Sequence, residues 1–177
     1  MLARLNGFNL ILFFIAAIFL AGFQTTFWFQ LFGGITPPML WLNLVLYLIL
    51  YRKPVEGILM TYAVVLIFSG FSAAPVGVLW LNLLVVFAIV SFVKVRIFWP
   101  GSRYFFLASL GISLCYEITM ISLSHYTDMH PTTLQFGRRL IEVIFTPLTS
   151  IPIYVLLAWI DDWTGRDFLP ESGGPES

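Results

Sequence analysis

Charged side chains are missing from two long stretches of the chain. None occurs between Arg4 and Arg52, and none between Glu56 and Lys94. Hydrocarbon strongly penalises a charge at its centre, and a soluble domain of 177 residues could not bury so much apolar chain. The pattern therefore predicts a membrane protein that surfaces at the short polar segment between the two stretches, residues 52–56.

The apolar runs between polar or Gly- and Pro-rich turns predict an all-α membrane protein, a compact bundle of about six transmembrane helices. A spanning helix needs about 20 apolar residues, so the chain has room for about six. The second predicted helix is short for a full span. It either begins among the preceding prolines or is part-spanning and buried against its neighbours. The predicted helices cover residues 7–29, 39–51, 55–71, 78–98, 103–125 and 134–163.

Proline and glycine mark the predicted turns. Pro37 and Pro38 precede the second helix, and Pro75 and Gly77 follow the third, so these four residues are interpreted as structural turn positions. Two further prolines, at 147 and 152, fall inside the last predicted helix, where the missing N–H and the ring favour kinks.

The distribution of Lys and Arg predicts the orientation. With six helices, one side of the membrane carries seven of these residues and the other two, so the positive-inside rule puts both termini in the cytoplasm. Residues 1–165 are predicted to form a single membrane domain, and residues 166–177 a disordered cytoplasmic tail. The first side holds Arg4, Arg52, Lys53, Lys94, Arg96, Arg103 and Arg166, and the second holds Arg138 and Arg139.

The amino-acid composition supports a membrane protein and excludes a soluble domain. The chain is 59% hydrophobic and 10% charged, with a net charge of zero, whereas soluble domains carry about 25% charged residues. There is no basic face for nucleic acid. The single cysteine, Cys115, excludes a disulfide within the chain. No phosphate loop, nucleophile elbow or metal signature occurs, so neither a catalytic site nor a metal or cofactor is expected.

Two polar clusters at helix ends are candidate contacts for a partner or lipid. The alternative is that they only anchor the helices and set topology. In the second cluster, Arg138 and Glu142 are four apart and share a face, which leaves Arg139 without a partner. The first cluster holds Arg52, Lys53, Pro54, Glu56 and Gly57, and the second holds Arg138, Arg139 and Glu142.

The polar residues Asn43, Asn82 and Glu117 lie within predicted spans and are expected inside the bundle. Asn43 and Asn82 are interpreted as amides that hydrogen-bond between helices. Glu117 is expected to face the interior, either as a structural hydrogen-bonded carboxyl or as a functional group. Its expected neighbours are Ser113, Thr119 and Ser122.

The order of several short segments resembles the bacterial rod shape-determining protein MreD family. The resemblance covers nearly the whole chain. It departs from the family at Ser69, where members often carry an aspartate, and at Thr61-Tyr62, where they favour a Gly-Phe-like step. The segments are Gln24-Thr25-Thr26, Pro37-Pro38-Met39-Leu40, Tyr51-Arg52-Lys53-Pro54, Glu56-Gly57, Ser72-Ala73-Ala74-Pro75-Val76-Gly77 and Trp159-Ile160-Asp161-Asp162-Trp163-Thr164-Gly165-Arg166.

This resemblance implies a non-enzymatic, multi-pass component of the cell-elongation machinery in the bacterial inner membrane. The partners it implies are an MreC-like periplasmic protein, an MreB-like filament, the wall-synthesis enzymes and membrane lipids. Two other functions stay open. Six helices in a short chain are also similar to the substrate-binding subunits of energy-coupling-factor transporters, in which Glu117, Asn82 and aromatic residues would line a vitamin-type pocket. The third is an intramembrane enzyme that uses Glu117 and Glu142.

Overall fold

The computed structural model describes residues 7–72, 74–97, 101–127 and 136–165, and all regular structure in these ranges is helical. The predicted helices are present with ends that differ by a few residues. The predicted tail, residues 166–177, lies outside the described residues. In chain order the elements are α1 (Gly7–Gly22), the π-helical turn η1 (Phe23–Phe27), α2 (Trp28–Phe32), α3 (Leu40–Tyr51), α4 (Pro54–Ser69), α5 (Val76–Arg96), α6 (Ser102–Thr127) and α7 (Phe136–Trp163).

Four helices within the described part of the chain are long and apolar enough to cross a membrane. Their outward faces carry large apolar side chains, including Phe19, Phe92 and Leu107, each more than 60% exposed. An exposed apolar surface of this extent suits lipid and not water. The prediction of a membrane protein is confirmed at this level, while six full spans stay a prediction. The four helices are Gly7–Phe32, Val76–Arg96, Ser102–Leu123 and Gly137–Trp163.

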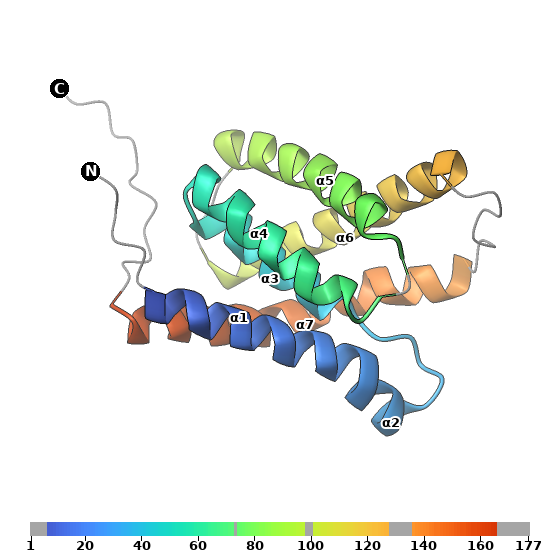
Figure 1. The fold of residues 1–177 in the computed structure, drawn as a ribbon, viewed down its shortest axis with the longest axis horizontal. Coiled ribbons are helices and arrows are strands. Elements are labelled where there is room, and N and C mark those ends of the chain that lie inside the picture. Colours follow the sequence, from blue (N-terminus) through green and yellow to red (C-terminus); the bar gives the residue numbers. More distant parts are fainter. Residues whose placement is uncertain (1–6, 73, 98–100, 128–135, 166–177) are drawn as a thin grey trace.

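The first helix begins and α7 ends at the same end of the bundle (Figure 1). The rings of Phe8 and Trp163 meet edge to face there, with centroids 5.6 Å apart. The turn between α3 and α4 lies at this end too, because Arg52 contacts Asp161. The start of α1, the α3–α4 turn and the end of α7 thus lie at one end of the bundle, as the predicted topology requires. The membrane side that this end faces stays a prediction.

The short helix α3 is buried on every face. Each residue from Leu40 to Leu50 is at most 5% exposed, because α1, α4, α5, α6 and α7 all pack against it. Its 12 residues span about 18 Å, well short of the roughly 30 Å hydrocarbon core. Of the two interpretations of the second predicted helix, the structure shows the buried one.

Side chains from other helices satisfy the N-terminal end of α3. The Met39 N–H donates to Thr146 Oγ1 of α7 at 3.0 Å, and the Leu40 N–H donates to Gln24 Oε1 at 3.1 Å. Gln24 comes from η1, which interrupts the long first helix. A helix end inside an apolar bundle needs such partners, since no water replaces them.

Lys94 satisfies the other end of α3. Its ammonium donates to the carbonyl oxygens of Ile49 at 2.9 Å and Arg52 at 3.4 Å. A cation at the C-terminal end of a helix also complements the helix dipole. Lys94 belongs to α5, so two helices far apart in sequence are joined at the terminus of the central one.

A layer of hydrogen bonds crosses the middle of the bundle at Asn43. Its amide donates to Thr146 O at 3.0 Å and to Thr149 Oγ1 at 3.3 Å, and its oxygen accepts from Ser109 at 2.5 Å. These bonds join α3 to α6 and α7. The side chain is fully buried, as predicted for this residue.

Asn43→Leu is expected to lower the free energy of unfolding by about 2 kcal/mol, because leucine keeps the volume and removes three interhelical bonds. Reversible unfolding in mixed micelles measures the loss. Ser122→Ala is the control, since this hydroxyl donates only to Ile118 O of its own helix. Equal stability of the two variants would show that the layer contributes nothing.

The helix α7 continues through Pro147 and Pro152. Proline lacks an N–H, so Pro147 leaves the Val143 carbonyl without its partner within the helix. The Ser113 hydroxyl of α6 lies 3.5 Å from that oxygen. Packing of α6 against α7 thus places a donor at the site of the missing bond, and the predicted kinks stay a prediction.

Candidate functional site

A buried ion pair links the α3–α4 turn to the end of α7. Arg52 contacts Asp161 Oδ1 at 2.5 Å, with both side chains at most 5% exposed. The Tyr47 hydroxyl donates to Asp161 Oδ2 at 2.6 Å, and the Asn9 amide donates to Oδ1 at 2.9 Å. Asn9 also accepts from Arg52 at 3.1 Å. Each charge is therefore paired and hydrogen-bonded, which the low dielectric of the bundle requires.

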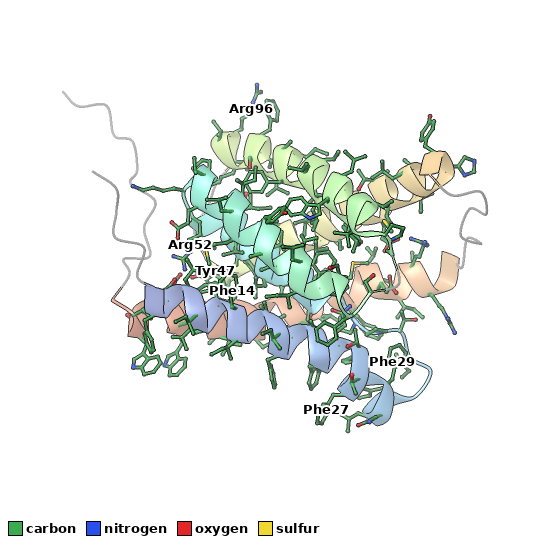
Figure 2. All side chains as sticks on the ribbon, in the orientation of Figure 1. Phe14, Phe27, Phe29, Tyr47, Arg52 and Arg96 are labelled. Carbon is green, nitrogen blue, oxygen red and sulfur yellow. The ribbon has the colours of Figure 1, made fainter. Side chains whose placement is uncertain are left out.

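The position of Arg52 corrects its interpretation as an exposed contact. It is 6% exposed, and its guanidinium carbon lies 4.8 Å from the centroid of the Phe13 ring. Figure 2 shows Arg52 directed into the bundle beside Tyr47, whereas Arg96 points away from it. Arg52, at the end of α3, thus joins this helix to Asn9 of α1 and Asp161 of α7. It is buried inside the bundle and not accessible to a partner.

The rest of the first cluster divides between surface and core. Lys53 and Pro54 are exposed, and Glu56 is half-buried in the first turn of α4, where the helix dipole favours a carboxylate. Gly57 is buried: a Cβ there would lie 3.1 Å from Leu48 O of α3. Gly57 thus permits close packing of α3 against α4 and is also not a surface contact.

A cavity of about 590 Å³ opens at the opposite end of the bundle. Its walls come from the η1–α2 region, the chain before α3, the α4–α5 turn and the facing ends of α6 and α7. This size lies within the usual range for small-molecule sites. The polar lining residues include Gln24, Glu117, Arg138, Arg139 and Glu142, and the aromatic ones are Phe29, Trp41, Phe68 and Tyr116.

The charged wall of the cavity pairs Arg139 with Glu117. The guanidinium forms a short ion pair with the buried Glu117 carboxylate, so Glu117 is interior as predicted. The expectation that Arg139 lacks a partner is wrong. Arg138, the expected partner of Glu142, is exposed and forms no ion pair with a described carboxylate. The Glu142 side chain faces that of Glu117, and the charges of Arg139 and Arg138 both act on it.

The aromatic residues of the cavity wall pack against one another. Trp41 stacks on Phe68 with ring centroids 4.4 Å apart and meets the edge of Tyr116 at 5.3 Å. Trp41 sits in the first turn of the buried helix α3, and Tyr116 precedes Glu117 on α6. The central helix therefore holds an aromatic surface directly beside the carboxyl groups.

Asn82 joins α5 to α6 near this cavity. It is fully buried; its amide donates to Tyr116 O at 3.3 Å and its oxygen accepts from Thr119. The prediction of an interhelical amide is confirmed. Its partner Tyr116 lies in the cavity wall, so Asn82 positions that wall without lining it.

The predicted turn residues lie at or beside turns. Pro37 and Pro38 occupy the non-helical segment before α3, and Pro37 lines the cavity. Pro75 is the residue before α5, and Gly77 is in the first turn of that helix. Pro75 and Gly77 are exposed, so their role is to end one helix and begin the next.

Sequence reasoning missed Asp161, Asn9, Gln24 and Trp41 as important positions. Asp161 follows an apolar run and precedes a second acidic residue, which gave it the pattern of an ordinary helix end. A signal was available for Asn9 and Gln24, because each is a polar side chain inside an apolar run with no local partner. Their partners lie far away in sequence.

The chemistry available in this site is recognition through charge and aromatic surface. Within the described ranges, no three potential metal-ligating side chains converge on one point. Arg139 holds the Glu117 carboxylate in place through their ion pair. No protein-family model, curated protein or solved structure matches this chain.

Proposed function

We propose that this chain is a non-enzymatic integral component of the bacterial cell-elongation machinery in the inner membrane. It would bind membrane partners such as an MreC-like protein and, with it, an MreB-like filament and the wall-synthesis enzymes. The observation that carries the proposal is the joining of two segments that resemble the MreD family. Arg52 belongs to the segment Tyr51-Arg52-Lys53-Pro54, and Asp161 belongs to the segment that begins at Trp159. These two residues form the buried ion pair.

This ion pair changes which surfaces are candidates for partner binding. Because Arg52 and Gly57 are used inside the bundle, the candidate surfaces are the outward helix faces together with the exposed residues Lys53, Pro54 and Arg138. Leu59 of α4 and Leu107 of α6 are 63% and 65% exposed. Helices in lipid associate through packed faces of this kind, without catalytic groups.

Photocrosslinking in cells tests the proposal. A photoreactive residue at Leu59 or Leu107 is expected to capture membrane proteins of the elongation machinery. The same residue at Leu42, which is fully buried, is the matched control and should capture none. Depletion of the chain should also abolish rod shape and regular wall insertion; unchanged rods after depletion would overturn the proposal.

The cavity favours a second candidate function, the substrate-binding subunit of a small-molecule transporter. Its 590 Å³ volume and mixed aromatic and charged lining suit capture of a small molecule. A vitamin-type ligand that co-purifies with the chain, together with normal rod shape after depletion, would favour this role over the first.

A further inference from the structure

Two arginines mark the ends of consecutive apolar helices at one surface. The span Val76–Arg96 ends at Arg96, and the span Ser102–Leu123 begins directly before Arg103. The connecting residues 97–101 can extend over at most about 20 Å, whereas the hydrocarbon core is roughly 30 Å thick. A connection of this length cannot cross the membrane. Arg96 and Arg103 therefore lie at the same membrane surface, whichever side that surface faces.

The turn between α3 and α4 brings a third cation to this surface. The Lys94 ammonium of α5 donates to the carbonyl oxygen of Arg52 at 3.4 Å, so the last turn of α5 lies against the end of α3. Lys53 follows Arg52 directly in the chain. Lys53, Arg96 and Arg103 are all exposed, and these three residues are called the basic rim.

The charges of the basic rim are not neutralised within the described part of the chain. No described carboxylate forms an ion pair with any of its three residues, and this includes Glu56 and Asp162 at the same end of the bundle. A Lys or Arg near a membrane surface attracts anionic lipid over a distance of about one Debye length. The basic rim therefore offers three such charges to the headgroups around it.

The apolar side chains beside Arg96 suit the rest of a lipid molecule. The Arg96 guanidinium carbon lies 4.7 Å from the centroid of the Phe92 ring, and Figure 2 shows Arg96 pointing away from the bundle. Phe92, Val95 and Ile97 are 62%, 87% and 67% exposed. An arginine that lies along exposed apolar side chains holds its charge at the boundary between acyl chains and headgroups. A water-soluble acidic partner would meet the charge and leave these apolar side chains uncovered.

We infer that the basic rim binds the phosphate groups of anionic phospholipids, with the acyl chains lying along Phe92 and Val95. A guanidinium binds phosphate in a bidentate manner, so Arg96 and Arg103 are the principal contacts and Lys53 adds a point charge. The alternative is that these cations only set the orientation of the helices during insertion. This inference goes beyond the role in cell elongation, and either can fail without the other.

Spin-labelled lipids test the inference on the full chain in phosphatidylcholine bilayers. Electron paramagnetic resonance measures the fraction of each labelled lipid that the protein immobilises. We expect the association constant of labelled phosphatidylglycerol to exceed that of labelled phosphatidylcholine by about threefold or more. The ratio should fall towards one in about 1 M salt, where exposed charges are screened. Equal association of the two lipids at low salt would overturn the inference.

Two double variants locate the lipid and separate charge from packing. Arg96→Gln with Arg103→Gln is expected to lower the ratio at least twofold. Arg96→Lys with Arg103→Lys keeps both charges and is the matched control, which should retain most of the selectivity. Helical circular dichroism checks that each variant is folded, and the salt dependence of the unaltered chain needs no variant. An unchanged ratio in the glutamine variant would place the lipid elsewhere and refute the basic rim as its site.

Discussion

Asp161→Ala is expected to lower the free energy of unfolding by about 3–5 kcal/mol, the usual cost of leaving a buried charge without its partner. The substitution leaves the Arg52 guanidinium inside the bundle with no anion. It also removes the acceptor of the Tyr47 hydroxyl and of the Asn9 amide. Unfolding in mixed micelles, followed by the loss of helical circular dichroism, measures the change.

The neighbouring carboxyl provides the control for this prediction. Asp162 is exposed, so Asp162→Ala should alter stability by less than about 0.5 kcal/mol. In the double variant Arg52→Met with Asp161→Leu, both charges are removed, and much of the lost stability should return. Similar stabilities for Asp161→Ala and Asp162→Ala would show that the ion pair does not hold the bundle together.

Gly57→Leu is expected to destabilise the protein by about 1–3 kcal/mol through overpacking. A Cβ at this position would lie 3.1 Å from the Leu48 carbonyl oxygen. That oxygen belongs to α3, which is enclosed on all faces and cannot move aside easily. The helix α4 must therefore shift away from α3, and thermal unfolding in nanodiscs should report a lower Tm.

Gly111→Leu is the matched control for this steric effect. Gly111 lies on the exposed side of α6, with no atom within 4 Å of the position of a Cβ. Because leucine is the better helix former, this change should leave stability equal or higher. A Tm for Gly57→Leu that equals that of Gly111→Leu would contradict the close contact between α3 and α4.

The helices could be predicted because their signal is local. Long apolar runs bounded by proline, glycine and charged turns mark a spanning helix wherever it packs. The burial of Asn43, Asn82 and Glu117 was predictable for a similar reason, since a polar group in a span avoids lipid. These conclusions depend on the cost of placing a group in hydrocarbon and not on which helix is adjacent.

The pairing of charges could not be predicted from spacing along the chain. Glu142 lies four residues from Arg138 and was expected to pair with it, yet the ion pair joins Arg139 to Glu117 on another helix. A cationic anchor was expected at Arg52, and its partner Asp161 lies 109 residues away. Helix rotation and neighbour choice decide such pairs, and both depend on the packing of whole helix faces.

By itself the sequence determined that this is a helical membrane protein, where its helices lie to within a few residues, and which polar residues avoid lipid. These properties follow from the transfer of each segment into hydrocarbon, which is a property of the segment alone. Only the tertiary structure decided that α3 is enclosed by five helices and that Arg52 forms a buried ion pair with Asp161. It also decided that Glu117 and Glu142 line one cavity together with aromatic residues. Those features are contacts between distant segments, and their energies exist only once the helices have packed.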